Sequence, residues 1–360
     1  MLTGTKTAAP QILGVGTANP ATVYSQEDVL NRYRIEDERI RSLFLKSHID
    51  RRHLLLPDVD GDGYPISEAQ GQLLGKHRAE GIRLAGEALA ACLKNADLDL
   101  DQVRYLCCVT STGFMTPGFS ALLIRELGLR PDTSRADIVG MGCNAGLNGL
   151  NPVASWATAN PGQLAVMVCV EVCSAAYVFD GTMRTAVVNS LFGDGSAAVA
   201  IRAPVSPLAD DTAGAPSILN FASRLIPDAI GAMRYEWDDD HGKFSFFLDR
   251  DIPYVVGAHA EEVIDRLLDG SRVGRSDISH WIVHSGGKKV IDSVRVNLRL
   301  TAHDVRHTVA VLRDYGNLSS GSFLFSYKHL LDEGLVEPGE YGVLMTMGPG
   351  STIETALLRW

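Results

Sequence analysis

The sequence predicts an α/β fold in which helices cover layers of β-sheet, and it predicts that this fold consists of two related halves. Segments with helical periodicity alternate with short β-branched runs along the 360-residue chain, a pattern typical of layered α/β proteins. Arg202–Ser217 is rich in Pro, Ala and Asp and is predicted to be a linker. It separates a predicted N-terminal half, residues 1–201, from a predicted C-terminal half, residues 218–360.

The individual elements follow in chain order. Helical periodicity predicts helices at Gly81–Ala96, Ser120–Leu127, Ala258–Leu268 and Lys289–Asn297. Apolar runs bounded by turn residues predict strands at Tyr105–Thr110, Leu164–Val170, Ala197–Ile201 and Trp281–His284. The uncharged span Ile138–Val170 is long enough to cross a bilayer, but several Asn residues, a Gln and two prolines interrupt it. We therefore expect a buried core element there and no membrane segment.

The two halves contain matching motifs. Val103–Ser111 aligns with Ile278–Gly286, and at nearly the same offset Gly142-Cys143 aligns with Gly316-Asn317. Each half then closes on a similar turn, Gly193-Asp-Gly-Ser in the first and Gly348-Pro-Gly-Ser in the second. An internal duplication explains these matches; chance similarity between α/β segments is the alternative. If the halves pack about a pseudo-two-fold axis, Cys143 and Asn317 begin equivalent helices and face a common site.

Composition excludes several classes of function. With 43 acidic and 33 basic residues the net charge is −10, which argues against a general role on nucleic acid or on a membrane surface. The chain does not begin with a signal-peptide pattern. Its six cysteines include no CxxC pair and no accompanying His cluster, so no metal site is predicted. Reduced thiols indicate a cytoplasmic protein.

Cys143 is the strongest candidate for a catalytic residue. It lies in Gly140-Met-Gly-Cys-Asn-Ala-Gly, where glycines permit a tight turn from strand to helix and the close approach of a ligand. A helix N-terminus and a nearby imidazole lower a thiol pKa from about 8.5 to roughly 3.5–7.5. We therefore expect a thiolate at neutral pH that attacks a thioester. The alternative is a buried structural cysteine.

Other candidates depend more on context. His284 ends an apolar strand before Ser-Gly-Gly, and it is either catalytic or one ordinary member of ten histidines. Asn317 either caps the helix that follows or, by symmetry with Cys143, donates a hydrogen bond in the site. Arg51 and Arg52 either bind phosphates or belong to a solvated surface. The glycine-rich turns match neither a P-loop nor a dinucleotide fingerprint, which argues against an oxidoreductase.

In their order along the chain, the motifs resemble the type III polyketide synthases, the chalcone synthase-like branch of the thiolase-fold condensing enzymes. The resemblance is nearly end to end, and the matching stretches are Gly14-Val-Gly-Thr-Ala-Asn-Pro, Ser47-His-Ile-Asp-Arg-Arg-His, Gly142-Cys-Asn-Ala-Gly, Leu191-Phe-Gly-Asp-Gly-Ser-Ala-Ala, His284-Ser-Gly-Gly, Tyr315-Gly-Asn-Leu-Ser-Ser and Gly348-Pro-Gly-Ser-Thr-Ile-Glu-Thr. It implies a thiolase-like five-layered αβαβα fold made of two pseudo-duplicated halves. It also implies a homodimeric acyltransferase that uses coenzyme A thioesters as substrates and needs neither a metal nor another cofactor.

The resemblance also implies roles for single residues. Cys143 resembles the nucleophile that accepts the acyl group, and His284 and Asn317 resemble the pair that hydrogen-bonds the thioester oxygen. Phe192 and Phe246 resemble two gatekeeping phenylalanines between a coenzyme A tunnel and the cavity.

Further positions complete the predicted substrate-binding set. The loop Gly113-Phe-Met-Thr-Pro-Gly resembles one that reaches into the partner subunit's cavity. Because the loop is one residue longer here, either Met115 or Thr116 makes that contact. The remaining predicted substrate-binding residues are Gly286, Gly287, Arg51 and Arg52.

Departures from the plant members indicate the product. Asn144 follows the nucleophile in place of a bulky aromatic residue, Met347 precedes Gly-Pro-Gly, and Lys288-Lys289 follows the His284 motif. These changes resemble the bacterial branch that makes 3,5-dihydroxyphenylacetyl-CoA for glycopeptide-antibiotic precursor biosynthesis. That resemblance implies malonyl-CoA as starter and for three extensions, cyclisation, and helper enzymes for dehydration as further partners.

Alternative functions remain open at this point. A tetrahydroxynaphthalene or a pyrone is the alternative product within the family. A ketoacyl synthase III-type enzyme, which takes acyl carrier protein, is the nearest alternative outside it. A non-catalytic thiolase-fold subunit would typically lack the nucleophile.

Overall fold

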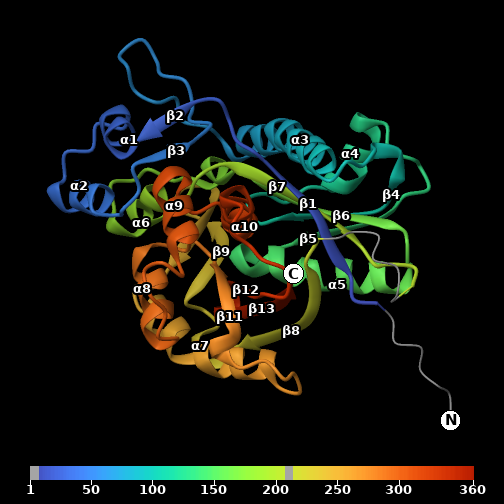
Figure 1. Cartoon of the computed structure of the whole chain (residues 1–360). Helices are drawn as coiled ribbons and strands as arrows, with labels where there is room; N and C mark the ends of the chain where they lie inside the picture. Colours follow the sequence, from blue (N-terminus) through green and yellow to red (C-terminus); the bar gives the residue numbers. More distant parts are fainter. Residues whose placement is uncertain (1–7, 207–213) are drawn as a thin grey trace.

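Residues 8–206 and 214–360 are described by the computed structural model (Figure 1). A large mixed sheet crosses the molecule, which confirms the predicted α/β class. Its nine strands, in spatial order, are β11 (Ile278–Val283), β12 (Tyr341–Gly348), β13 (Thr352–Arg359), β8 (Ser217–Leu225), β1 (Gln11–Ala18), β7 (Gly195–Arg202), β6 (Leu164–Glu171), β4 (Val103–Thr110) and β5 (Ser134–Val139).

The pairing of these strands repeats. In the N-terminal part, β4 pairs parallel with β6, β6 antiparallel with β7, and β7 antiparallel with β1. In the C-terminal part, β11 pairs parallel with β12, β12 antiparallel with β13, and β13 antiparallel with β8. The two series meet where Gln11 of β1 pairs with Ser217 of β8. The same order and the same strand directions therefore occur twice, as an internal duplication predicts.

Helices complete the layers. Because β1 and β8 pair at one residue pair only, the two parts of the large sheet are called here the N-terminal sheet (β1, β7, β6, β4, β5) and the C-terminal sheet (β8, β13, β12, β11). α5 (Ala145–Ala159) and α10 (Ser322–Glu333) each contact strands of both and so lie between them. On the outer face of the N-terminal sheet, α3 (Gln70–Asn95) packs on β1, β7 and β6 together with α4 (Phe119–Leu127). On the opposite outer face, α7 (Ile252–Leu268) packs on β8 and β13 together with α8 (Lys288–Asn297). The resulting order is helix, sheet, helix, sheet, helix.

Close packing of α3 on the sheet requires glycine in β1. A Cβ atom at Gly16 would lie 2.2 Å from the backbone nitrogen of Cys92 and 2.3 Å from the carbonyl oxygen of Ala88. The strand and helix backbones are therefore in direct contact, as the absence of a side chain permits. The apolar side of α3, with Leu84, Ala88 and Cys92, is fully buried there.

The predicted elements coincide with observed ones, although several are shorter than the real elements. α3 begins eleven residues before the predicted helix. The prediction missed its first turns because only Leu73 and His77 are buried there, too few for a helical apolar pattern. The uncharged span Ile138–Val170 forms the end of β5, α5 and most of β6. Within the described residues, no helix combines the length and the apolar character needed to cross a membrane.

Smaller elements cover the region where the two halves meet. They are β2 (Val23–Ser25), α1 (Gln26–Arg32), α2 (Glu38–Leu45), β3 (Arg51–His53), α6 (Met183–Leu191), β9 (Met233–Asp238), β10 (Lys243–Leu248) and α9 (Arg306–Tyr315). The predicted linker, residues 202–217, falls between β7 and β8, but its residues 207–213 lie outside the described part of the chain. The division into residues 1–201 and 218–360 stays a prediction.

Candidate active site

Cys143 lies in a single helical turn, Gly142–Asn144, that leads directly into α5. Gly142 has a φ of +76°, and a Cβ atom there would lie 2.2 Å from Cδ of Pro349. Only glycine therefore allows the Gly348-Pro-Gly turn of the C-terminal half to pack against the residue that precedes the cysteine. The Cys143 side chain is buried, with 7% of its surface exposed. A small residue in one half thus admits a turn from the other half beside the thiol.

Asn317 lies at the equivalent position of the other half, between α9 and α10. Its Oδ1 accepts a hydrogen bond from the backbone N–H of Ser319 at 2.8 Å. Oδ1 also accepts from the Ser322 hydroxyl at 3.4 Å, so the amide is oriented with its oxygen as acceptor and its NH2 group as donor toward the Cys143 sulfur. The Asn317 amide and the Ser319 hydroxyl lie beside the Cys143 sulfur and act to lower its pKa. The structure therefore brings Cys143 and Asn317 together directly.

His284 follows β11 and reaches the same region through its neighbours. Its backbone N–H donates to the carbonyl of Met345 at 2.8 Å, which continues the pairing of β11 with β12. The next residue, Ser285, donates its hydroxyl to the carbonyl of Gly316 at 3.4 Å, so the end of β11 is tied to the turn that carries Asn317. The imidazole is buried, and its Nδ1 has no hydrogen-bond partner in the described structure.

Gly286 and Gly287 form the turn beside this imidazole. The backbone N–H of Gly286 donates to the His284 carbonyl at 2.9 Å. A Cβ atom at Gly286 would lie 3.0 Å from Cδ2 of the His284 ring. Gly287, with a φ of +123°, precedes the first residue of α8. The absence of a side chain at Gly286 therefore leaves room beside the imidazole, whereas a Cβ atom at Gly287 would lie 3.3 Å from Cδ1 of Leu191. A role of either glycine toward a substrate stays a prediction.

Burial acts against the expected thiolate. Burial raises the pKa of the Cys143 thiol to about 12, and the negative charge of Glu171 acts in the same direction. Burial also lowers the pKa of His284 to about 3. Loss of hydration outweighs the effect of the helix end and the adjacent donors. Burial thus disfavours the charged form of both side chains, and the thiolate at Cys143 stays a prediction.

Phe192 and Phe246 stack on each other next to the thiol. Their ring centroids lie 5.4 Å apart with 17° between the planes, and both belong to the buried cluster that contains Cys143. Phe192 follows α6 and is bridged to Asn317: the N–H of Asn317 donates to the carbonyl of Leu191, and the N–H of Gly193 donates to the carbonyl of Asn317, both at 2.9 Å. The gate position and the amide are therefore held by one backbone bridge.

Two residues near the site escaped the sequence analysis. Glu171 ends β6 and is fully buried; its carboxylate accepts hydrogen bonds from the Ser111 N–H and the Thr112 hydroxyl, both at 3.0 Å, and from the Ser320 hydroxyl at 2.5 Å. Burial raises its pKa to about 7. Tyr235, opposite Phe246 in the β9–β10 hairpin, stacks on that ring at 4.5 Å. The signal available for Glu171 was one acidic residue at the end of an apolar strand.

The predicted phosphate contact by Arg52 is wrong. Arg52 is fully buried, and its guanidinium is engaged by groups inside the protein. Its neighbour Arg51 lies on the opposite face of β3, where it is exposed and forms an ion pair with Asp314 at 3.2 Å. Side chains alternate between the two faces of a strand, so two adjacent arginines cannot share one role here. A contact between Arg51 and phosphates stays a prediction.

The loop expected to reach a partner subunit lies at the surface. Met115 packs partly against the chain's own cluster, which includes Phe119 and Leu123. Thr116 is exposed, and Phe114 exposes 68% of its surface. The exposed residues are thus the ones available to a second subunit, although the choice between Met115 and Thr116 stays a prediction.

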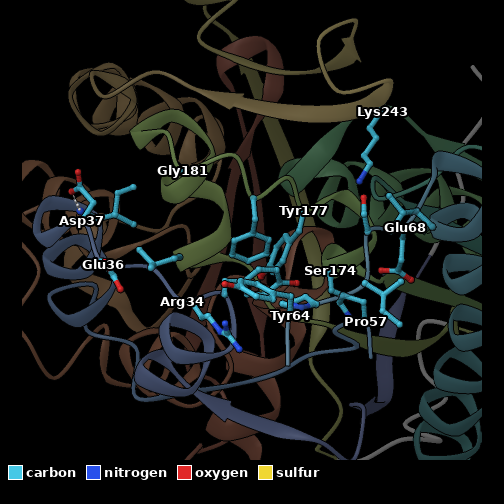
Figure 2. Close-up of a pocket in the computed structure, with 18 residues that line it drawn as sticks. Arg34, Glu36, Asp37, Pro57, Tyr64, Glu68, Ser174, Tyr177, Gly181 and Lys243 are labelled. Carbon is cyan, nitrogen blue, oxygen red and sulfur yellow. Dashed lines mark hydrogen bonds between the residues drawn. The ribbon is translucent and has the colours of Figure 1, made fainter. Parts of the chain in front are cut away.

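A separate cavity of about 450 Å³ is lined by residues that include Tyr33, Ser174 and Tyr177. Arg34 and Asp37 lie on one side of it and Lys243 and Glu68 on the other, with Tyr177 between them (Figure 2). The catalytic candidates do not line this cavity. Among the residues that the structure describes, no three His, Cys, Asp or Glu side chains are placed to bind a metal ion together.

Comparisons with known proteins agree with this geometry. Residues 3–204 match the family described as chalcone and stilbene synthases, N-terminal domain, and residues 219–360 match the C-terminal domain of the same family. The 3,5-dihydroxyphenylacetyl-CoA synthase of Streptomyces toyocaensis is 64% identical over 98% of this chain and 90% of its own length. The enzyme of the same name from Amycolatopsis balhimycina is 63% identical over 98% and 94%. The 1,3,6,8-tetrahydroxynaphthalene synthase of Streptomyces peucetius subsp. caesius is 32% identical over 97% and 93%.

Solved structures give the same result. PKS-I from the brown alga Ectocarpus siliculosus superposes with a TM-score of 0.90 at 26% identity and covers 99% of both chains. The 1,3,6,8-tetrahydroxynaphthalene synthase of Streptomyces coelicolor A3(2) superposes with a TM-score of 0.86 at 27% identity, over 97% of this chain and 99% of that one. The predicted thiolase-like layered fold is confirmed.

Proposed function

The chain belongs to the chalcone and stilbene synthases, the type III polyketide synthases, and from this premise we propose that it converts malonyl-CoA into 3,5-dihydroxyphenylacetyl-CoA. Its activity is that of an acyltransferase that forms carbon–carbon bonds by Claisen condensation. The observation that supports the product is 61–64% identity, over 98% of this chain, to three synthases that carry that name. Identity to the tetrahydroxynaphthalene synthase is only 32%. In this proposal the product serves as a precursor of glycopeptide antibiotics.

The first step loads the starter on Cys143. The Cys143 sulfur attacks the thioester carbonyl of malonyl-CoA as its proton passes to His284. The carbon–sulfur bond to coenzyme A then breaks, and the proton on His284 goes to the leaving thiolate. His284 acts as base and then as acid, as in other enzymes that use an activated nucleophile.

The second step makes the new nucleophile. A second malonyl-CoA loses carbon dioxide, and the electron pair of the broken bond forms an enolate whose charge lies on the thioester oxygen. Donors from Asn317 and His284 stabilise that charge. They act strongly because the site is buried, and one comparable donor is worth about 3–4 kcal/mol in other enzymes. The enolate carbon attacks the carbonyl held on Cys143, and the carbon–sulfur bond to Cys143 then breaks, which frees the sulfur and leaves a chain two carbons longer on coenzyme A. Transfer of this chain back to Cys143 releases coenzyme A and prepares the next extension.

Three such extensions add six carbons to the three-carbon malonyl starter, and loss of the starter's own carboxylate as carbon dioxide leaves an eight-carbon chain that cyclises and loses water. Phe192, Phe246 and Tyr235 form an aromatic wall beside the thiol, and such a wall keeps water away from the thioester and from reactive ketones. Malonyl-CoA and coenzyme A are the small-molecule partners. The proposal uses no metal and no further cofactor, and helper enzymes for dehydration stay a prediction.

We also propose that the protein acts as a homodimer in the cytoplasm. The exposed loop with Phe114 and Thr116 is the surface that supports dimerisation, because large apolar side chains at such exposure are typical of interfaces. The six cysteines are unpaired in the structure, as expected in a reducing compartment.

Incubation of the purified protein with malonyl-CoA as the only acyl donor tests the proposed product. We expect 3,5-dihydroxyphenylacetyl-CoA by liquid chromatography and mass spectrometry against an authentic standard. A tetrahydroxynaphthalene or a pyrone as the main product would overturn the product assignment while leaving the family intact. Turnover of malonyl carrier protein but not of malonyl-CoA would instead indicate a ketoacyl synthase.

A further inference from the structure

Arg52 is a buried cation at the centre of the site's support. It lies on β3, and no part of it is exposed. Its Nη1 donates to the carbonyls of Phe192 and Asn189, both at 2.7 Å, and to the Tyr177 hydroxyl at 2.9 Å. Its Nη2 donates to Oε1 of Gln26 at 2.6 Å. All of these acceptors are neutral.

This arrangement is unfavourable as a device for stability alone. No carboxylate among the described residues lies within ion-pair distance of Arg52. Burial lowers the pKa of its guanidinium, and the buried carboxylate of Asp194 only partly opposes this shift from a longer distance. Charged groups are costly to bury without a paired opposite charge, and apolar replacements of buried charges are often neutral or stabilising. The geometry that the guanidinium imposes on its acceptors is therefore the feature to explain.

The carbonyl of Phe192 is the acceptor that leads to the reaction. It accepts hydrogen bonds from Arg52 and also from the Tyr177 hydroxyl, so two donors fix one oxygen atom. The same backbone segment carries the bridge to Asn317, through the carbonyl of Leu191 and the N–H of Gly193. The guanidinium thus binds the carbonyl of Phe192, and the residues on either side of Phe192, Leu191 and Gly193, are hydrogen-bonded to the backbone of Asn317.

The stem of Arg52 contacts the other side of this bridge. Gly316 has a φ of +72°, and a Cβ atom there would lie 2.8 Å from Cδ of Arg52 and 2.6 Å from the carbonyl oxygen of Leu191. Arg52 therefore packs against the residue before Asn317 while its head group holds Phe192. Both sides of the bridge rest on one side chain.

We propose that Arg52 is a positioning residue for the condensation, which holds the Phe192 ring and the Asn317 amide in register with Cys143. This inference rests on the proposed function, since it assigns Arg52 to the decarboxylation and condensation steps. A donor displaced by a fraction of an ångström loses much of its effect on a developing charge, while attack by the Cys143 thiol needs no movement of that donor. Changes at Arg52 should therefore affect decarboxylation more than loading.

The test compares Arg52→Lys and Tyr177→Phe with the control Arg275→Lys. Arg275 is a partly exposed arginine whose partners are Glu261 and Asp265, far along the chain from the site. For each protein the acylated fraction of Cys143 is measured by intact mass, acetyl-CoA release from malonyl-CoA reports decarboxylation, and Tm reports folding. Steady-state kcat and KM for malonyl-CoA complete the set.

We expect Arg52→Lys to lower decarboxylation roughly ten- to hundredfold per loaded site, with loading and KM within about threefold of wild type. Tyr177→Phe removes one of the two donors to Phe192 and keeps the ring, so the loss should be about three- to tenfold at nearly unchanged Tm. The control should stay within about twofold. If Arg52→Lys does not fold, Tyr177→Phe decides.

Three results separate the explanations. A decarboxylation rate per loaded site equal to wild type in both variants would show that Arg52 serves folding only. A raised KM with unchanged kcat would instead indicate that Arg52 contacts the substrate. Either result would overturn the inference. If the wild-type protein fails to load or turn over malonyl-CoA, the proposed function fails independently of the variants.

Discussion

The two halves of the molecule share a backbone plan and divide the chemistry. β4, β6, β7 and β1 repeat in β11, β12, β13 and β8 with the same pairing directions. At the start of the inner helix of each series, one half places Cys143 and the other Asn317. The duplication therefore supplies the geometry of a common site, whereas single substitutions within the repeat supply the nucleophile and the donor.

The ends of equivalent strands show the same division. β6 ends in Glu171, a carboxylate held by serine and threonine donors, while its counterpart β12 ends in Gly348. β4 runs into Ser111 and Thr112, while β11 runs into His284. The N-terminal series also has an additional edge strand, β5, for which the described C-terminal residues form no counterpart. Each half therefore contributes groups that the other lacks.

The largest effects should come from removing the functional side chain at each of the two helix starts. We expect Cys143→Ala to abolish turnover, with a loss of about five orders of magnitude or more, because no group replaces the nucleophile. Asn317→Ala should lower turnover about 10²–10³-fold, because one donor to the enolate oxygen is lost. Initial rates of coenzyme A release from malonyl-CoA measure both. Equal losses in the two variants would contradict the division of roles.

The contact between the two inner helices gives a matched pair of glycine variants. A Cβ atom at Gly146 in α5 would lie 2.1 Å from the carbonyl oxygen of Ser320, whereas at Gly321 before α10 the nearest atom would be 3.6 Å away. Gly146→Ala should therefore destabilise the protein by roughly 1–3 kcal/mol. Gly321 has an α-helical φ of −86°, so Gly321→Ala should be neutral or slightly stabilising, by up to about 1 kcal/mol.

Chemical denaturation of both variants checks this asymmetry. If Gly321→Ala were the more damaging change, the halves would not meet as the structure describes.

The buried carboxylate of the N-terminal half should produce a pH-dependent stability. Burial raises the pKa of Glu171 from 4.5 to about 7, so the folded state binds this proton more tightly than the unfolded state. The resulting stabilisation is present below about pH 4.5 and is lost as pH rises to about 7. Glu171→Gln resembles the protonated form. As pH rises from about 4.5 to about 7, the free energy of unfolding of the variant should therefore increase relative to that of the wild type, by at most roughly 3 kcal/mol. Denaturation curves at pH 5 and pH 8 measure it; a difference independent of pH would refute the assignment.

The smallest effect is expected at the surface of β3. Arg51 is exposed and ion-paired with Asp314, and exposed pairs contribute about 0–1 kcal/mol. If Arg51 also contacts the phosphates of coenzyme A, Arg51→Gln should raise KM for malonyl-CoA up to about fivefold with kcat unchanged. Steady-state kinetics at low and moderate salt measure the change. A decrease in kcat instead would place Arg51 in the same role as its buried neighbour.

Features that depend on local sequence patterns could be predicted from the sequence. Features that depend on burial in the folded protein could not. The alternation of elements and the alignment of Gly142-Cys143 with Gly316-Asn317 predicted the fold class and the meeting of the two helix starts. The first turns of α3 were missed because few of their residues are buried. Burial also determines the direction in which the pKa values of Cys143 and His284 shift, the different environments of Arg51 and Arg52, and the position of Glu171. These depend on contacts between segments far apart in the chain, which a linear pattern does not contain.

In the proposed mechanism Cys143 carries the growing chain, while Asn317, from the other half, stabilises the enolate. Peptide mapping by mass spectrometry after brief incubation with malonyl-CoA tests it directly, with the buried Cys169 and Cys173 of the same protein as internal controls. We expect an acyl adduct on the peptide that contains Cys143 in the wild type, the same adduct in Asn317→Ala, and none in Cys143→Ala. An adduct on another cysteine, or one that persists in Cys143→Ala, would contradict the account.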